Sequence, residues 1–160
     1  MVFWDASALA KAYGQEQGTP SVLGALSASR GRGFLSDHVA IEVLMVFAKW
    51  LRTRRFSHAA YRTAVSDFFR DYPSAFNLVD VDESVRKQAL TLAQSLRSLG
   101  IGGMDVLHLA SAMHVQASVS PRPVVLASAD GPLLNAASIT GLATFNPEVE
   151  PLAKVLGVLR

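Results

Sequence analysis

The chain of 160 residues predicts one α/β domain, with a mostly parallel sheet covered by helices on both faces. Short apolar runs alternate with segments of helical period, which is typical of parallel strands joined by helical crossovers. Half of the residues are hydrophobic and 18% are charged, so the chain can build one sizeable core. The length suits a single domain over residues 1–160.

The expected elements alternate along the chain. Strands are expected at short apolar runs, namely Val2–Trp4, Gly33–Ser36, 76–81, 123–128 and 142–145. Helices are expected at 7–13, 19–29, 37–52, 57–71, 83–100, 104–118 and 133–138.

Local signals justify these elements in chain order. Pro20 stands in the first turn of the second helix, where proline is tolerated. Ser57 and Asp82 are typical N-cap residues for the fourth and fifth helices. The Gly-Ile-Gly-Gly stretch at 100–103 separates the fifth helix from the sixth. The uncharged, valine-rich run at 123–128 is typical of a buried parallel strand.

Several classes of protein are excluded by the composition. The chain has no cysteine, which removes disulfide scaffolds, thiolate metal sites and cysteine nucleophiles. Lys11, Glu42 and Lys49 interrupt the most apolar windows, so no membrane-spanning segment is predicted. A strand-like Val-Phe-Trp-Asp directly after Met1 predicts no signal peptide, and we expect a cytoplasmic protein.

Charge is unevenly distributed along a chain of formal net charge +2. Residues 30–70 contain eight Lys and Arg side chains against three acidic ones. Such a segment favours an anionic partner, with nucleic acid the leading candidate, although a solvated helix face has the same composition.

Two predicted strands end at an aspartate that has a serine two residues away. Asp5 follows the first strand and precedes Ser7, whereas Asp130 follows the fourth strand and Ser128. Ligands of open parallel sheets bind beyond the carboxyl ends of the strands. Each aspartate also stands directly before a predicted helix, where N-capping is the usual role. Either residue alone is therefore ambiguous.

Two further acids strengthen the case for a site. Glu42 is the only charged residue in the apolar stretch 39–48, and Asp105 stands in the first turn of the sixth helix with His108 on the same face. Each residue also has a purely structural explanation. Glu42 fits a polar stripe along its helix, Asp105 interacts favourably with the helix dipole, and His108 fits a histidine packed in the core. Four carboxylates at one sheet edge would repel one another unless a cation lay between them. Such oxygen ligands favour Mg²⁺ or Mn²⁺ and, beside a basic surface, indicate phosphodiester hydrolysis.

Four blocks of sequence carry a family resemblance. They are Phe-Trp-Asp-Ala-Ser-Ala-Leu at 3–9, Ser-Asp-His-Val-Ala-Ile-Glu-Val at 36–43, Gly-Met-Asp-Val-Leu-His-Leu-Ala-Ser-Ala at 103–112 and Leu-Ala-Ser-Ala-Asp-Gly-Pro-Leu-Leu-Asn-Ala-Ala at 126–137. In this order and at this spacing, the chain resembles the PIN-domain nucleases, and within them the VapC-type toxins of prokaryotic toxin–antitoxin pairs. The Gly-Pro after Asp130 departs from the family, in which a polar or basic residue is common.

The resemblance implies a five-stranded parallel sheet between helices. It implies Mg²⁺- or Mn²⁺-dependent endonucleolytic cleavage of RNA by a metal-activated water, with 5′-phosphate and 3′-hydroxyl products. Members usually form dimers and are silenced by a cognate antitoxin. The family's catalytic, metal-binding acids match Asp5, Glu42, Asp105 and Asp130, and its supporting hydroxyls match Ser7 and Ser128. We expect His108 to support this cluster from the core.

Other chemistries find no matching motif. The sequence has no Gly-x-Ser-x-Gly elbow, no Walker A loop and no i, i+4 histidine pair, which sets aside serine hydrolases, P-loop enzymes and zinc hydrolases. An aspartyl-phosphate enzyme would need a second acid where Ser7 stands. A catalytically inactive PIN-like module that binds RNA or protein remains the alternative, although all four acids are present.

Two surfaces complete the expectations. Arg52, Arg54 and Arg55 follow Glu42 by about three helical turns, roughly 15 Å, so we expect them to bind RNA phosphates or an antitoxin segment rather than the reacting atoms. The helices at 39–51 and 57–69 are apolar on more than one face, which predicts a homodimer. The competing explanation is that these residues fill the domain's own core.

Overall fold

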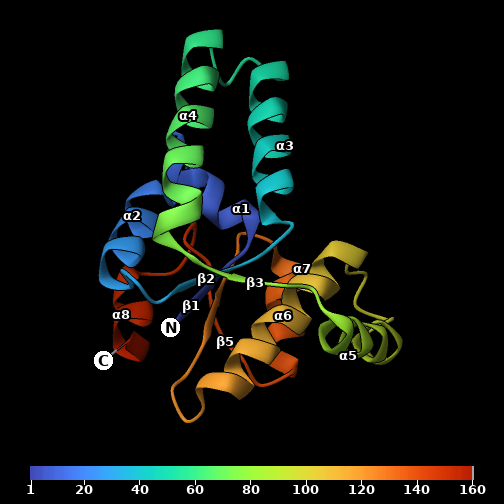
Figure 1. The fold of residues 1–160 in the computed structure, drawn as a ribbon. Coiled ribbons are helices and arrows are strands. Elements are labelled where there is room, and N and C mark those ends of the chain that lie inside the picture. The colour runs from blue at the N-terminus through green and yellow to red at the C-terminus, as the bar shows by residue number, and fades with distance from the viewer. Residues whose placement is uncertain (160) are drawn as a thin grey trace.

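Strand β1 (Val2–Trp4) lies at the centre of a five-stranded sheet in the computed structural model (Figure 1). The strand order is β3-β2-β1-β4-β5, and every pair is parallel. The structure describes residues 1–159, so Arg160, the last residue of the predicted domain, lies outside the described residues. The remaining strands are β2 (Gly33–Ser36), β3 (Asn77–Val79), β4 (Val125–Ala127) and β5 (Ala143–Phe145).

Helices cover both faces of this sheet because the side chains of β1 alternate between two apolar cores. Val2 and Trp4 belong to one core and Phe3 to the other, and all three are fully buried. The first core includes α1 (Ala6–Leu9), the 3₁₀-helix η1 (Ala10–Tyr13), α2 (Thr19–Ala28), α3 (Val39–Arg52), α4 (His58–Ala75) and α8 (Leu152–Leu159). The second includes α5 (Glu83–Ser95), α6 (Gly103–Val119) and α7 (Gly131–Ile139). The predicted α/β class is confirmed.

Helices α3 and α4 form an antiparallel pair that projects beyond the sheet (Figure 1). We call this pair, with the connecting residues 53–57, the α3–α4 hairpin. Phe47, Trp50 and Phe68 are buried in it, and the Phe47 ring packs on Trp50 and Phe68 with ring centroids 5.8 and 6.2 Å apart. These aromatic residues were part of the predicted dimer surface, and they fill the protein's own core instead. Phe69, at 52% exposure, remains on the surface.

The structure departs from the expected elements mainly at their ends. Helix α8 was not expected, because it is short and only Val155 of its side chains is fully buried. Helix α5 ends at Ser95, five residues before the glycine expected to terminate it. None of the described helices is both long enough and apolar enough to cross a membrane.

Candidate metal centre

The carboxyl ends of β1, β2 and β4 meet at one edge of the sheet, and each carries a polar side chain. Asp5 follows β1, Ser36 ends β2, and Ser128 follows β4. Helices α3, α6 and α7 begin after this edge or beside it, with acidic residues in their first turns or at their N-caps. Parallel topology therefore gathers groups that are far apart in sequence.

Asp5 is held in place by two serine hydroxyls. Its Oδ2 accepts hydrogen bonds from the Ser7 amide (3.1 Å), from Ser7 Oγ and from Ser128 Oγ (2.9 Å). The serine oxygens accept in turn from the amides of Ala129 and Asp130, both at 2.9 Å. The side chain is buried, at 5% exposure, and its other oxygen, Oδ1, lies 3.6 Å from His108 Nε2. The serines thus occupy one oxygen of Asp5 and direct the second toward the interior of the site.

Asp105 and Asp130 each have a structural role as well. Asp130 Oδ1 accepts from the Leu133 amide (2.8 Å) as the N-cap of α7, and Asp105 Oδ2 accepts from the Gly102 amide (2.8 Å) at the start of α6. Among the described residues, no donor bonds the second oxygen of either carboxylate. Helix capping therefore uses one oxygen of each aspartate and leaves the other for a ligand.

The charges of these aspartates act on one another. Burial raises the pKa of the Asp105 carboxyl above its ordinary value, and the negative charges of Asp130 and Asp5 raise it further. The hydrogen bond from Gly102 offsets only part of this effect. Burial and the neighbouring charges of Asp130 and Asp5 thus both disfavour the ionised form of Asp105.

His108 connects the fourth acid to this group. Its side chain is fully buried, Nδ1 lies 2.8 Å from Ser36 Oγ, and Nε2 hydrogen-bonds Glu42 Oε2. Burial lowers the pKa of His108, but Glu42 and Asp5 outweigh burial and raise it overall. Burial raises the pKa of Glu42, but the hydrogen bond from His108 and the charge of His108 outweigh burial and leave the pKa below its ordinary value. The structure thus places His108, which we expected to support the acidic cluster, between Ser36 and Glu42.

Two residues at the site, Ser36 and His38, were not among the sequence candidates. Ser36 ends its strand just as Asp5 and Ser128 follow theirs, so the strand-end pattern could have identified it. The His38 ring lies 4.7 Å from that of His108, centroid to centroid. Within the described part of the chain, one group of three His or acidic residues has its ligand atoms all within 4.8 Å of one another: His38, Glu42 and His108.

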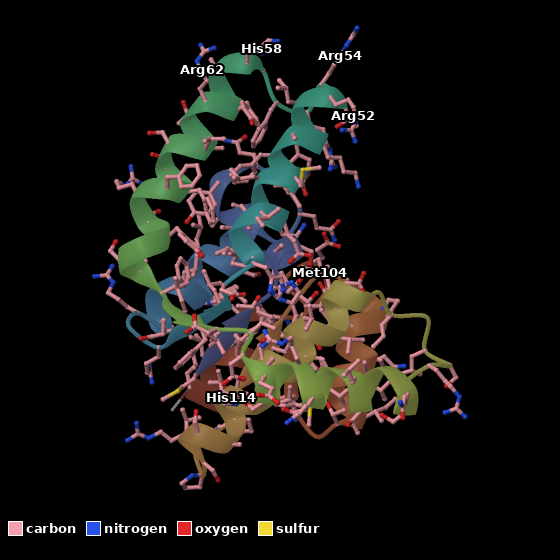
Figure 2. The ribbon with its side chains drawn as sticks, turned by 45° about the vertical axis from the view of Figure 1, so that its right-hand side comes forward. Arg52, Arg54, His58, Arg62, Met104 and His114 are labelled. Atoms are coloured by element: carbon pink, nitrogen blue, oxygen red, sulfur yellow. The ribbon has the colours of Figure 1, made fainter. Side chains whose placement is uncertain are left out.

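The structure places two of the three candidate arginines, Arg52 and Arg54, away from the acidic residues at the sheet edge. Figure 2 shows Arg52 and Arg54 at the outer end of the α3–α4 hairpin, away from Met104 in the first turn of α6. Arg55 pairs with Glu16 through Nη1 and Oε1 at 2.6 Å. Arg52 and Arg54 thus remain available for an anionic partner, while Arg55 is engaged within the protein.

Comparison with family models matches residues 2–132 to the PIN domain. This match spans most of the chain, and the chain therefore belongs to the PIN domain family. The resemblance recognised in the four sequence blocks is confirmed at the level of the family. No curated protein sequence matches the chain significantly.

Solved structures share the fold at low sequence identity. FitAcB from Neisseria gonorrhoeae has a TM-score of 0.68 and 17% identity, over 94% of this chain and 100% of that one. FitAB bound to an IR36 DNA fragment has a TM-score of 0.64 and 16% identity, over 94% and 98%. Mycobacterium tuberculosis VapC20, a sarcin-ricin loop cleaving toxin, has a TM-score of 0.64 and 17% identity, over 94% and 100%.

Replacing Asp105 with Asn tests the concentration of charge. Asn can still accept the Gly102 hydrogen bond, while the repulsion from Asp130 and Asp5 is removed. We expect the free energy of unfolding at neutral pH, measured by denaturant titration in EDTA, to rise by up to about 1 kcal/mol. The matched control is Glu83→Gln, which removes a charge from the first turn of α5 and breaks an ion pair with Lys87. That control should be neutral or slightly destabilising. An equal decrease in the free energy of unfolding in both variants would contradict mutual repulsion among the carboxylates.

Proposed function

We propose that the protein is a Mg²⁺- or Mn²⁺-dependent endoribonuclease and the toxin of a toxin–antitoxin pair. The observation that carries the proposal is the set of incompletely bonded carboxylate oxygens at one sheet edge of a PIN domain. Membership of the family supports nuclease chemistry. The fold similarity to VapC20, described as a toxin that cleaves the sarcin-ricin loop, supports RNA as the substrate and toxin as the role.

The ligand types at this edge of the sheet suit a divalent cation. Asp5, Asp105 and Asp130 each direct one oxygen away from their structural hydrogen bonds, and Glu42 supplies the fourth carboxylate. Carboxylate oxygens are ligands that Mg²⁺ and Mn²⁺ accept. When bound, the cation supplies the positive charge that activates a water for attack on phosphorus and stabilises the leaving oxygen.

The chain's own residues orient this site. Ser7 and Ser128 fix the rotation of the Asp5 carboxylate, so its Oδ1 is presented in one direction. His108 restrains Glu42 from the buried side, and Ser36 restrains the His108 ring. Such preorganisation lowers the cost of assembling ligands around a cation. We assign Ser7, Ser128 and His108 as positioning residues.

We place the RNA backbone along the α3–α4 hairpin. Arg52 and Arg54 stand exposed at its outer end, and their charges would bind phosphates of a strand that continues toward the carboxylates. We assign Arg55 a smaller contribution to RNA binding because it already forms an ion pair with Glu16.

We also propose a cognate antitoxin and a homodimer as partners. Ile41 and Met45 on α3 are 67% and 62% exposed, one helical turn apart, and Phe69 on α4 is exposed as well. Exposed apolar side chains on these two neighbouring helices favour a protein partner.

The nuclease proposal is tested with purified protein and a structured RNA. We expect cleavage with Mg²⁺ or Mn²⁺, none with EDTA, and a loss of at least about a hundredfold in Asp5→Asn. The products should carry 5′-phosphate and 3′-hydroxyl ends. The control is Asp67→Asn, a charge removal on the exposed side of α4, which should cleave at the wild-type rate. Cyclic 2′,3′-phosphate ends would contradict the mechanism, and RNA binding without cleavage would favour the inactive module.

Removal of the hairpin arginines tests the RNA path. In EDTA, Arg52→Ala/Arg54→Ala should bind RNA more weakly, and the slope of log affinity against log salt should fall by about 1.4 for two lost phosphate contacts. The charge-matched control Lys87→Ala/Arg97→Ala on the α5 side should keep the wild-type slope. Fluorescence anisotropy measures both. An unchanged slope in the hairpin variant would show that these arginines only solvate the helix end.

A further inference from the structure

Two imidazoles stand beside the carboxylates, and the proposed Mg²⁺ chemistry uses neither of them as a metal ligand. His38, at the N-cap of α3, and His108, on α6, have ring centroids 4.7 Å apart. Glu42 completes a group of three whose ligand atoms all lie within 4.8 Å of one another. His108 is buried, whereas His38 and Glu42 are partly exposed. The group is therefore anchored in the core by His108 and reaches solvent through His38 and Glu42.

Each imidazole is oriented by an oxygen on its Nδ1 side. His108 Nδ1 lies 2.8 Å from Ser36 Oγ, and His38 Nδ1 lies 3.2 Å from Asp37 Oδ1. A bound metal would displace the proton through which His108 Nε2 bonds Glu42. With the hydrogen of each ring then on Nδ1 and donated to these oxygens, Nε2 of each ring has its lone pair free for the metal. Metal-binding histidines commonly show this arrangement, in which an oxygen fixes the tautomer and the ring orientation. His38 Nε2 is also 3.4 Å from Ser36 Oγ, so both imidazole rings lie beside the same serine hydroxyl.

The ligand types select the metal. Two imidazole nitrogens and one carboxylate, with a further position open, are the donor set of catalytic zinc sites. Mg²⁺ prefers oxygen and takes imidazole poorly, whereas first-row transition metals such as Co²⁺ and Zn²⁺ take it readily. We propose that His38, Glu42 and His108 form a transition-metal site for Zn²⁺, distinct from the carboxylate site but sharing Glu42 with it.

The shared ligand has a consequence for regulation. A Zn²⁺ ion that holds Glu42 withdraws one of the four carboxylates from the Mg²⁺ site, and its charge lies close to Asp5, whose Oδ1 is 3.6 Å from His108 Nε2. Zn²⁺ would therefore inhibit Mg²⁺-dependent cleavage. This inhibition rests on the proposed function, whereas the binding of the metal does not.

Co²⁺ is the probe, because a tetrahedral Co²⁺ complex with nitrogen ligands absorbs visible light strongly and Mg²⁺ is silent. The wild-type chain, free of RNA and Mg²⁺, should bind one Co²⁺ with such an absorption band. Zn²⁺ added afterwards should abolish the band by replacing Co²⁺. The variant His38→Ala should weaken Co²⁺ binding more than about tenfold.

His38 is the residue to change because its side chain makes no capping hydrogen bond to α3 and is partly exposed. His108 is fully buried, so its replacement would confuse folding with binding. The matched control is His114→Ala, an exposed histidine of α6 far from Met104 (Figure 2), which should bind Co²⁺ as the wild type does. A wild-type spectrum without the tetrahedral band, or equal affinity in His38→Ala and wild type, would overturn the site. A protein that binds Co²⁺ in this way and cleaves no RNA would leave the inference standing and refute only the proposed nuclease.

Discussion

Mutual repulsion among carboxylates is the constraint on which this site depends. The topology brings Asp5, Asp105 and Asp130 to one edge of the sheet, and burial prevents water from screening them fully. His108 hydrogen-bonds Glu42 and lies beside Asp5, and these two carboxylates raise its pKa despite its burial. A divalent cation, if it binds there as we propose, would neutralise these charges and stabilise the folded chain.

The fold tolerates this concentration of charge because the same residues build its framework. Asp5 and Asp130 cap the helices that follow β1 and β4, and Asp105 closes the first turn of α6. Each uses one oxygen for the backbone, and the other makes no backbone hydrogen bond among the described residues. A capping role and a ligand role are therefore compatible in one side chain, and structural use of an aspartate does not argue against function.

The predictable part of the structure was local. Short apolar runs located all five strands, and the N-caps Ser57 and Asp82 accept the expected amide hydrogen bonds from Ala60 and Val85. The acids could be chosen because strand ends and first helical turns are recognisable in sequence. The contact between Ser36 and His108 could not be predicted, because it joins residues 72 positions apart and depends on how β2 and α6 pack. The proximity of His38 to His108 depends on the same packing.

The most direct test of the carboxylate site is a crystal structure after soaking with Mn²⁺, with anomalous diffraction used to locate the ion. The charge concentration at the sheet edge predicts an anomalous peak bound by oxygens of Asp5, Asp105 and Asp130, with Glu42 beside it. The peak should disappear in Asp5→Asn crystals soaked in the same way. Crystals that show Mn²⁺ elsewhere on the protein, or no Mn²⁺ among these carboxylates, would contradict a divalent cation as the centre of this site.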